Sequence, residues 1–302
     1  VLCGRAYDDL LPLLRDTGLE GELTEEGCLS LYTDEAEFRA DRDHIEILER
    51  FGFPHEVIGR QTIQALEPEL SDKIGMAVLF PENRSLRDPH RLVVKLAERF
   101  QALGGRIETG EVAGFDRAKG IRGLRLKDGR AIAADEVVIC AGAFTGRLSK
   151  LLGEPIPLET ERGYNTTLPP GAFDLRTQVT FGGHGFVVTR LSSGVRVGGA
   201  VEFAGLDRPP NVSRADAMLE KAARFLPGLK TTGGRRWMGF RPSLPDSLPA
   251  IGLARGTEQV AYAFGHGHLG LTQSAGTARL VADLLTGRPA ALDLSPFSPQ
   301  RF

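Results

Sequence analysis

Apolar residues in the last third of the chain follow a pattern that predicts a buried strand and then a helix. Residues 260–264 form a short apolar run that stops at Gly265, as in a strand buried on both faces. Between residues 271 and 285 the apolar positions recur at helical spacing, and a glycine and a proline follow as stop signals. A helix is therefore expected to begin near Gly270.

The rest of the pattern alternates between helices and strands up to about residue 154 and then becomes mainly strand-like. Helices are predicted at residues 5–17, 33–51, 61–66, 88–103, 145–152 and 213–225, the last capped by Ser213. Strands are predicted at residues 28–32, 77–80, 106–108, 135–142 and 250–252, with a β-meander at 112–134. Residues 155–204 contain strand-like runs of alternating apolar and polar residues, separated by turns rich in glycine, proline and serine. This pattern predicts an antiparallel sheet.

These elements indicate a mixed α/β fold. The composition of the chain then excludes several classes of function. With 302 residues, 41% of them hydrophobic and 25% charged, the chain can bury a sizeable core, most simply as two interleaved domains. A net charge of -2 gives no basic surface for nucleic acid, and no run approaches the ~18 apolar residues of a membrane span. Cys3, Cys28 and Cys140 lack metal or redox spacing, so no metal site and a reduced, cytoplasmic setting are expected.

The segment between the predicted strand and helix reads Gly265-His266-Gly267-His268-Leu269-Gly270, which matches the dinucleotide pattern G-x-G-x-x-G. That pattern needs a complete βαβ unit, and no second parallel strand can be drawn after the helix. The turn still has a physical use. Its glycines let a flat ligand approach the backbone, and the helix start offers unpaired N–H groups and a partial positive charge. Such a site suits an anion, or a ring that becomes anionic.

Arg241 is a second candidate, because it follows an apolar residue near the predicted end of a strand. The local sequence is Gly239-Phe240-Arg241-Pro242. A guanidinium group in such a place is a good two-pronged donor to a carboxylate. The alternative is a structural ion pair with one of the chain's own acidic residues.

Four segments together resemble the D-amino-acid oxidase and dehydrogenase family of flavoproteins, and bacterial D-amino-acid dehydrogenases most closely. They are residues 195–202 (VRVGGAVE), 239–246 (GFRPSLPD), 265–272 (GHGHLGLT) and 137–142 (VVICAG). The resemblance runs from about Gly21 to the C-terminus. It implies that FAD lies under the 265–272 loop and that Arg241 holds the carboxylate of the substrate.

The resemblance also implies the architecture: a doubly wound FAD-binding domain of glutathione-reductase type, interleaved with an antiparallel-sheet substrate domain. We expect residues 88–150 and 240–302 to form the FAD-binding domain, and residues 1–87 and 151–239 to form the substrate domain. In the family the FAD pyrophosphate fingerprint lies at the very N-terminus, and this chain opens further downstream, at Val1. The first βαβ unit is therefore expected to be missing and the sequence to be truncated.

The resemblance assigns roles to particular residues. Arg241, Tyr164 and His268 are the predicted catalytic residues. FAD is expected to contact Val112, Cys140, Ala141, Gly142, Gly265, Gly267, His268, Leu269, Gly270, Leu271 and Thr272. The alternatives are a half-buried sheet aromatic for Tyr164 and a hydrogen-bonding turn residue for His268. His184, Glu202, Arg84 and Ser85 are further candidates, with a solvated turn as the alternative for His184, Arg84 and Ser85.

The predicted reaction is oxidation of the α C–N bond of a D-amino or imino acid by hydride transfer to the flavin, giving an imino or keto acid. A sarcosine-like N-methyl amine oxidase or demethylase is the alternative among enzymes. The non-enzymatic alternative is a truncated subunit that lacks flavin and only binds carboxylates or a partner chain. The pattern leaves open whether a quinone or O2 accepts the electrons, and whether the protein contacts the inner membrane peripherally.

Overall fold

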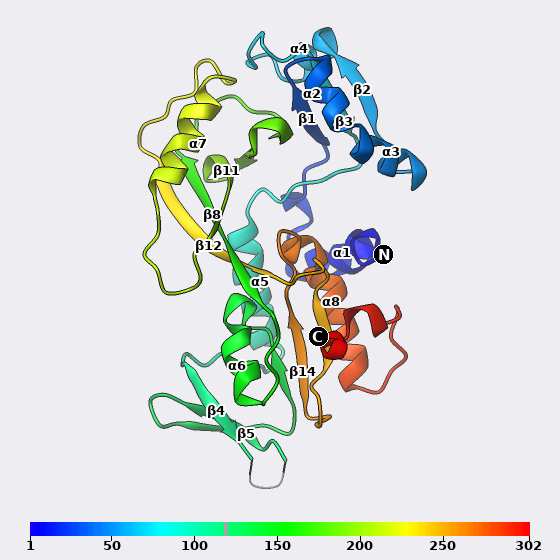
Figure 1. Ribbon diagram of the computed structural model, residues 1–302, viewed down its shortest axis with the longest axis vertical. Coiled ribbons are helices and arrows are strands. Elements are labelled where there is room, and N and C mark those ends of the chain that lie inside the picture. The colour runs from blue at the N-terminus through cyan, green and yellow to red at the C-terminus, as the bar shows by residue number, and fades with distance from the viewer. Residues whose placement is uncertain (118–119) are drawn as a thin grey trace.

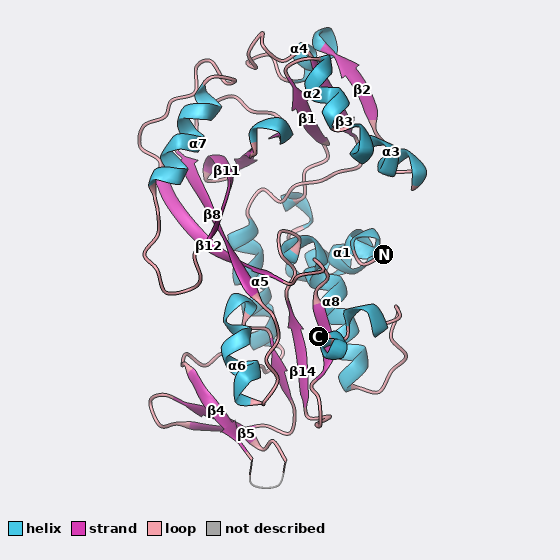
Figure 2. Cartoon of the chain, in the orientation of Figure 1, coloured by secondary structure: helices cyan, strands magenta, loops and turns pink. Residues whose placement is uncertain are grey.

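Three β-sheets organise the part of the chain that the computed structural model describes, residues 1–117 and 120–302. The largest has eight strands and occupies the upper half of the molecule in Figure 1. A three-stranded sheet lies in the middle of the molecule, and a second small sheet lies at the lower end. Helices pack around the two upper sheets, so the fold is mixed α/β as predicted (Figure 2).

The eight-stranded sheet is assembled from two distant parts of the chain. Its strand order is β12 (Arg235–Ser243), β8 (Glu159–Leu168), β11 (Gly194–Phe203), β10 (Phe186–Leu191), β9 (Gln178–Phe181), β1 (Cys28–Tyr32), β3 (Met76–Phe80) and β2 (Glu56–Gly59). Neighbouring strands run antiparallel except β1 and β9, which are parallel. The antiparallel sheet predicted for residues 155–204 is therefore confirmed, and it is extended by strands from both sides in sequence.

The two faces of this sheet differ because successive side chains of a strand point to opposite sides. One face carries the largest apolar cluster, which includes Phe181 stacked on Phe186 at 4.4 Å, and α7 (Ser213–Ala223) packs against it. Ser213 was expected to cap α7, and this is wrong. It is the first helical residue, and its hydroxyl donates to the Asn211 side chain instead of an amide of the helix.

The middle sheet contains the predicted buried strand, β14 (Val260–Phe264), parallel to β7 (Val137–Ile139) and antiparallel to β13 (Ala250–Leu253). The helix α8 (Gly270–Leu285) follows β14 and begins where the pattern predicts. Two more helices, α1 (Ala6–Thr17) and α5 (Pro89–Ala102), pack with α8 through an apolar cluster that includes Leu14, Leu92 and Ala275. Residues 6–17 were expected to belong with the large sheet, but the apolar face of α1 is buried against α8.

The remaining elements mostly follow the prediction. The lower sheet is the expected meander of β4 (Val112–Asp116), β5 (Gly123–Leu126) and β6 (Ala131–Ala133); within it, Ala118 and Lys119 lie outside the described residues. Short helices are α4 (Arg60–Leu66) and α6 (Thr145–Leu151), and 3-10 turns lie at Cys3–Arg5, Glu20–Glu22, Gly142–Phe144, Gly182–His184, Ser295–Phe297 and Pro299–Arg301. None of the helices described has both the length and the apolar character needed to cross a membrane.

Two local predictions are wrong for identifiable reasons. The helix expected over residues 33–51 is two helices, α2 (Glu35–Ala40) and α3 (Arg42–Arg50), which meet at Asp41. The Tyr32 hydroxyl donates to the Asp41 carboxylate at 2.7 Å and anchors that junction to the sheet. The strand expected at residues 106–108 does not form, because no strand in the described part of the chain lies beside it to complete a hydrogen-bond ladder.

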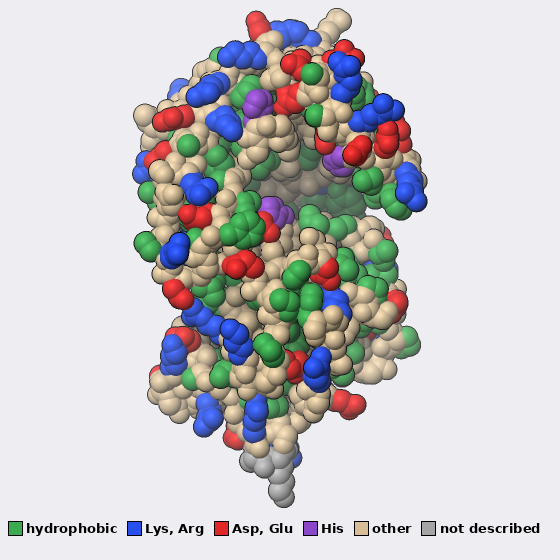
Figure 3. Space-filling view, viewed as in Figure 1, with side chains coloured by type: hydrophobic (Ala, Val, Ile, Leu, Met, Phe, Trp, Pro, Cys, Tyr) green, Lys and Arg blue, Asp and Glu red, His purple; other side chains and the backbone are tan. Residues whose placement is uncertain are grey.

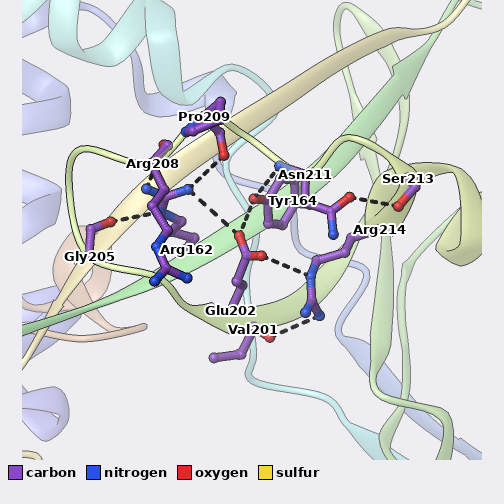
Figure 4. Close-up of polar contacts among 10 residues, drawn as sticks. All are labelled: Arg162, Tyr164, Val201, Glu202, Gly205, Arg208, Pro209, Asn211, Ser213 and Arg214. Atoms are coloured by element: carbon purple, nitrogen blue, oxygen red, sulfur yellow. Dashed lines mark hydrogen bonds and ion pairs between the residues drawn. The ribbon is translucent and has the colours of Figure 1, made fainter.

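A buried arginine holds the loop after β11 to the sheet (Figure 4). Arg162 on β8 has no solvent exposure, and its guanidinium donates to the carbonyls of Gly205 at 2.8 Å, Arg208 at 2.7 Å and Pro209 at 3.1 Å. The Glu202 carboxylate lies 3.7 Å from the same guanidinium. A buried charge is tolerated only when it is paired and fully hydrogen-bonded, and Arg162 meets that requirement.

We predict that Arg162→Ala lowers the free energy of unfolding by about 3 kcal/mol or more, because three loop carbonyl groups would lose their donor and Glu202 would lose a charged neighbour. Urea denaturation followed by circular dichroism measures the change. Arg147→Ala is the matched control, since it removes an exposed ion pair to Asp207 in the same loop and should cost less than about 0.5 kcal/mol. Equal, small effects of the two changes would show that Arg162 does not hold the loop.

Candidate active site

Three strand ends meet between the large sheet and the middle sheet. The strands β7 and β14 are parallel, so residues 140–142 and the turn at 265–270 emerge at the same edge. The end of β12 reaches this turn, because the Gly267 amide donates to the Pro242 carbonyl at 2.8 Å. On the other side, the Phe144 ring packs edge-on against Phe240 at 5.8 Å. The structure thus brings together residues 140–142, the glycine turn and the end of β12 that carries Arg241.

The turn itself has a backbone that only glycine adopts readily. Gly265 and Gly267 have φ values of 84° and 52°, in the left-handed region. A Cβ at position 265 would also lie 2.5 Å from the Leu244 side chain. The helix α8 then begins without a capping side chain, which leaves its first amide groups available to an outside acceptor. The side chains of Leu269 and Leu271 are about half exposed at this helix start.

Arg241 lies on the face of the large sheet opposite to α7. Its guanidinium rests on the backbone of Gly163 in β8, where a Cβ would come within 2.3 Å of the guanidinium carbon. Its only protein acceptor among the described residues is the Ala200 carbonyl, at 3.4 Å. Burial lowers the pKa of Arg241 and the nearby Glu161 opposes that shift, yet no carboxylate in the described part of the chain forms an ion pair with it. The structural ion pair considered for Arg241 is therefore absent.

Glu161 was missed by the sequence analysis. It lies directly across from Arg241 on β8, and its Oε2 atom is 2.8 Å from Nε2 of His268 in the glycine turn. The Ser243 hydroxyl and the His268 ring hold the pKa of Glu161 below its ordinary value. The alternation along β8 could have shown that Glu161 and Gly163 share a face. No local signal could have paired Glu161 with His268, because they are 107 residues apart.

Tyr164 was predicted to be a catalytic residue, but the structure does not bring it to the candidate site. Tyr164 follows Gly163 on β8 and so points to the opposite face, where it is 1% exposed. Its hydroxyl donates to Glu202 at 2.5 Å and accepts the Asn211 amide at 3.0 Å (Figure 4). The alternative interpretation, a buried aromatic of the sheet, describes it. Glu202 is removed from the candidate site by the same network.

His266 has a structural role that the sequence analysis did not predict. Its Nε2 atom is 2.9 Å from the Thr277 hydroxyl on α8, and burial lowers the pKa of His266 to about 4. The ring is therefore neutral near pH 7 and joins the turn to the helix. In contrast, the ring of His268 is half exposed and reaches away from α8 toward Glu161.

The other predicted residues lie elsewhere. Val112 begins β4 in the lower sheet, which Figure 1 shows at the lower end of the molecule. His184 is partly covered by Phe225, with 4.5 Å between ring centroids, and its Nε2 atom is 3.7 Å from Glu37, so it is not a solvated turn residue. Arg84 pairs with Glu25 at 3.4 Å on the surface. None of these contacts joins the group around Arg241.

The surface has more than one hollow that could hold a ligand. A cavity of about 490 Å³ lies between the 170–178 segment and β10, but neither Arg241 nor the glycine turn lines it. The space-filling view shows a deep hollow between the upper and lower halves, with a histidine and apolar side chains at its rim (Figure 3). We place the candidate site at this second hollow, because the glycine turn and Arg241 meet between those halves. No cluster of His, Cys, Asp or Glu suited to a metal ion is present among the described residues.

Comparison with known proteins gives one consistent answer. The family model described as DAO, FAD dependent oxidoreductase, matches residues 1–284. A D-amino-acid oxidase of Bradyrhizobium diazoefficiens is 37% identical over 243 residues, which are 78% of this chain and 57% of that protein. A D-amino acid dehydrogenase of Rhizobium rhizogenes is 30% identical over 95% of this chain and 70% of its own length.

The fold agrees with the sequence relatives. The crystal structure of glycine oxidase from Geobacillus kaustophilus superimposes with a TM-score of 0.85 and 26% identity, covering 99% of this chain and 81% of the other. The predicted fold class is thereby confirmed. With a family model that spans nearly the whole sequence and a shared fold, the chain belongs to the DAO family of FAD-dependent oxidoreductases.

Proposed function

We propose that this protein oxidises the α C–N bond of a D-amino or imino acid, with FAD as the hydride acceptor and an imino acid as the product. The observation that carries the proposal is Arg241. It is a half-buried cation with no carboxylate partner among the described residues, and it lies beside the glycine turn. A cation that is partly desolvated without an internal anion favours an anionic ligand, and the carboxylate of an amino acid supplies one.

The residues around the turn fit FAD. The backbone at Gly142 is left-handed, with a φ of 53°, and no atom lies within 4 Å of where its Cβ would be, so a ligand can approach it closely. The uncapped start of α8 offers amide donors, and Leu269 and Leu271 offer apolar contact to a ring. We propose that residues 140–142 and 265–272 contact the cofactor, which supplies the oxidising power of the reaction.

The chain's own contribution is mainly positioning. A guanidinium fork on a carboxylate fixes both the distance and the angle of the bound molecule, which sets the direction of its α-hydrogen. Arg241 is itself held by its contact with Gly163 and its hydrogen bond to Ala200. The names of the relatives support amino acids as substrates, and D-amino acids in particular.

We further propose that the chain divides into two parts. The large sheet with α7 forms the substrate part, and the middle and lower sheets with α1, α5 and α8 form the FAD-binding part. Anaerobic mixing of the FAD-loaded protein with a panel of D-amino acids tests the function directly. Bleaching of the visible flavin band by some members of the panel is expected, and a flavin that no amino or imino acid reduces would contradict the proposal.

We predict that Arg241→Lys lowers kcat/KM by at least about tenfold, or ~1.4 kcal/mol, although the charge is kept. The reason is that lysine cannot hold a carboxylate with two parallel hydrogen bonds. Arg241→Met should lose more activity, with unchanged flavin content in both variants. Steady-state rates with the preferred amino acid and flavin absorbance measure these effects. Normal turnover by the methionine variant would show that the carboxylate is held elsewhere.

Gly163 provides an independent test, because it lies under the guanidinium without taking part in any reaction. A methyl group at position 163 would overlap Arg241 and push it off the sheet. We expect Gly163→Ala to raise KM by about tenfold or more with little change in flavin content. Gly59→Ala is the matched control, since its Cβ would enter open space. Kinetics of Gly163→Ala that match this control would contradict the described position of Arg241.

A further inference from the structure

We propose that Glu161 receives the amino group of the substrate, so that Glu161 and Arg241 together select molecules carrying both a carboxylate and an amine. The inference rests on the proposed function and adds a residue that determines specificity. It starts from a pair of opposite charges that stand directly across from each other on β8 and β12.

The two charges share a face and lie near each other, but their side chains form no ion pair. Side chains opposite one another in an antiparallel pair have Cβ atoms roughly 4.5–5.5 Å apart, close enough for a Glu and an Arg to form an ion pair. Here Arg241 lies over Gly163 and donates to Ala200, whereas Glu161 turns toward His268. The sheet thus presents a separated cation and anion. This arrangement is complementary to a zwitterion, whose own two charges are held apart by its α-carbon.

The ionisation and the exposure of Glu161 suit it to accept a hydrogen bond from a bound ammonium group. His268 and Ser243 keep its pKa below the ordinary value, so it is ionised near neutral pH. Its Oε2 atom is 2.8 Å from Nε2 of His268, and the Ser243 hydroxyl lies beside the same carboxylate. The side chain keeps 21% of its surface exposed, so the carboxylate can meet a ligand. His268 then acts as a positioning residue that fixes the direction of the carboxylate.

The charge of Glu161 also suits the reaction. FAD would supply the oxidising power here, taking the α-hydrogen of the substrate as hydride once the bound ammonium group has given a proton to water. The nitrogen lone pair forms the C=N bond at the same time, and the nitrogen becomes positively charged. A fixed carboxylate beside that nitrogen stabilises the developing charge, which a neutral group cannot do to the same extent.

A purely structural role for Glu161, as an anchor for the glycine turn, makes a different prediction. Loss of an anchor would disturb the cofactor and weaken every ligand equally. Loss of an amine acceptor would weaken only ligands that carry an amine. Comparison of an amino acid with the carboxylic acid of the same shape that lacks the amino group therefore separates the two roles.

The test uses Glu161→Gln, which keeps a hydrogen-bond partner for His268 and removes the charge. Dissociation constants for D-alanine and for propionate are measured by calorimetry on the FAD-loaded protein. We expect D-alanine to bind at least about tenfold more weakly, with propionate changed by less than about twofold. Glu159→Gln, an exposed change two residues away on the same strand, is the control for net charge and should alter neither.

Two outcomes would overturn the inference: equal weakening of D-alanine and propionate by Glu161→Gln, or no change in either. Arg241→Met should weaken both ligands, which confirms that both use the carboxylate site. Failure of the proposed function looks different. In that case no amino acid reduces the flavin of the unmodified protein, whereas the comparison of D-alanine with propionate still reports whether Glu161 binds an amine.

Discussion

The pairing of β8 with β12 is the constraint on which the site depends, because it decides which side chains share a face. All nine residues of β12 pair with β8, and the register places Gly239 opposite Gly163 and Arg241 opposite Glu161. Gly163 leaves room for the Arg241 guanidinium above the sheet, and Gly239 leaves room for the Trp237 ring. A slip of one residue would send Arg241 into the apolar core beneath α7 and bring Phe240 to the open face.

The two faces of β8 carry residues with different roles: those on the covered face stabilise the fold, and those on the open face are proposed to bind ligand. On the covered face, Arg162 and Tyr164 have every polar group satisfied and are nearly or fully inaccessible to solvent. On the open face, Glu161 and Arg241 keep unused hydrogen-bonding capacity. Also on the covered face, the Arg162 guanidinium lies 5.5 Å from the ring centroid of Phe240, the residue before Arg241. The backbone that carries Arg241 is thus supported from below by a rigid, charged group.

Local signals predicted much of this fold, and the failures share one cause. The strand, glycine turn and helix at residues 260–285 are set by nearby residues, so the pattern located them well. The strand at residues 106–108 failed because a strand needs a neighbour. Tyr164 was misplaced because the face that a residue takes depends on register, which the motif around it does not contain. The pairing of Glu161 with His268 joins two segments that are distant in sequence, and neither segment contains a local pattern that predicts it.

The parallel contact between β1 and β9 has a consequence for how the chain folds. Cys28 pairs with Gln178, so the large sheet cannot close until more than half of the chain has been synthesised. The strand β12 is made later still, and the glycine turn after that. Contacts between such distant segments slow folding, because a long loop must close before they form. The surface that holds Arg241 and Glu161 is therefore completed only after β12 and the glycine turn have been made, later than the strands β1 to β11.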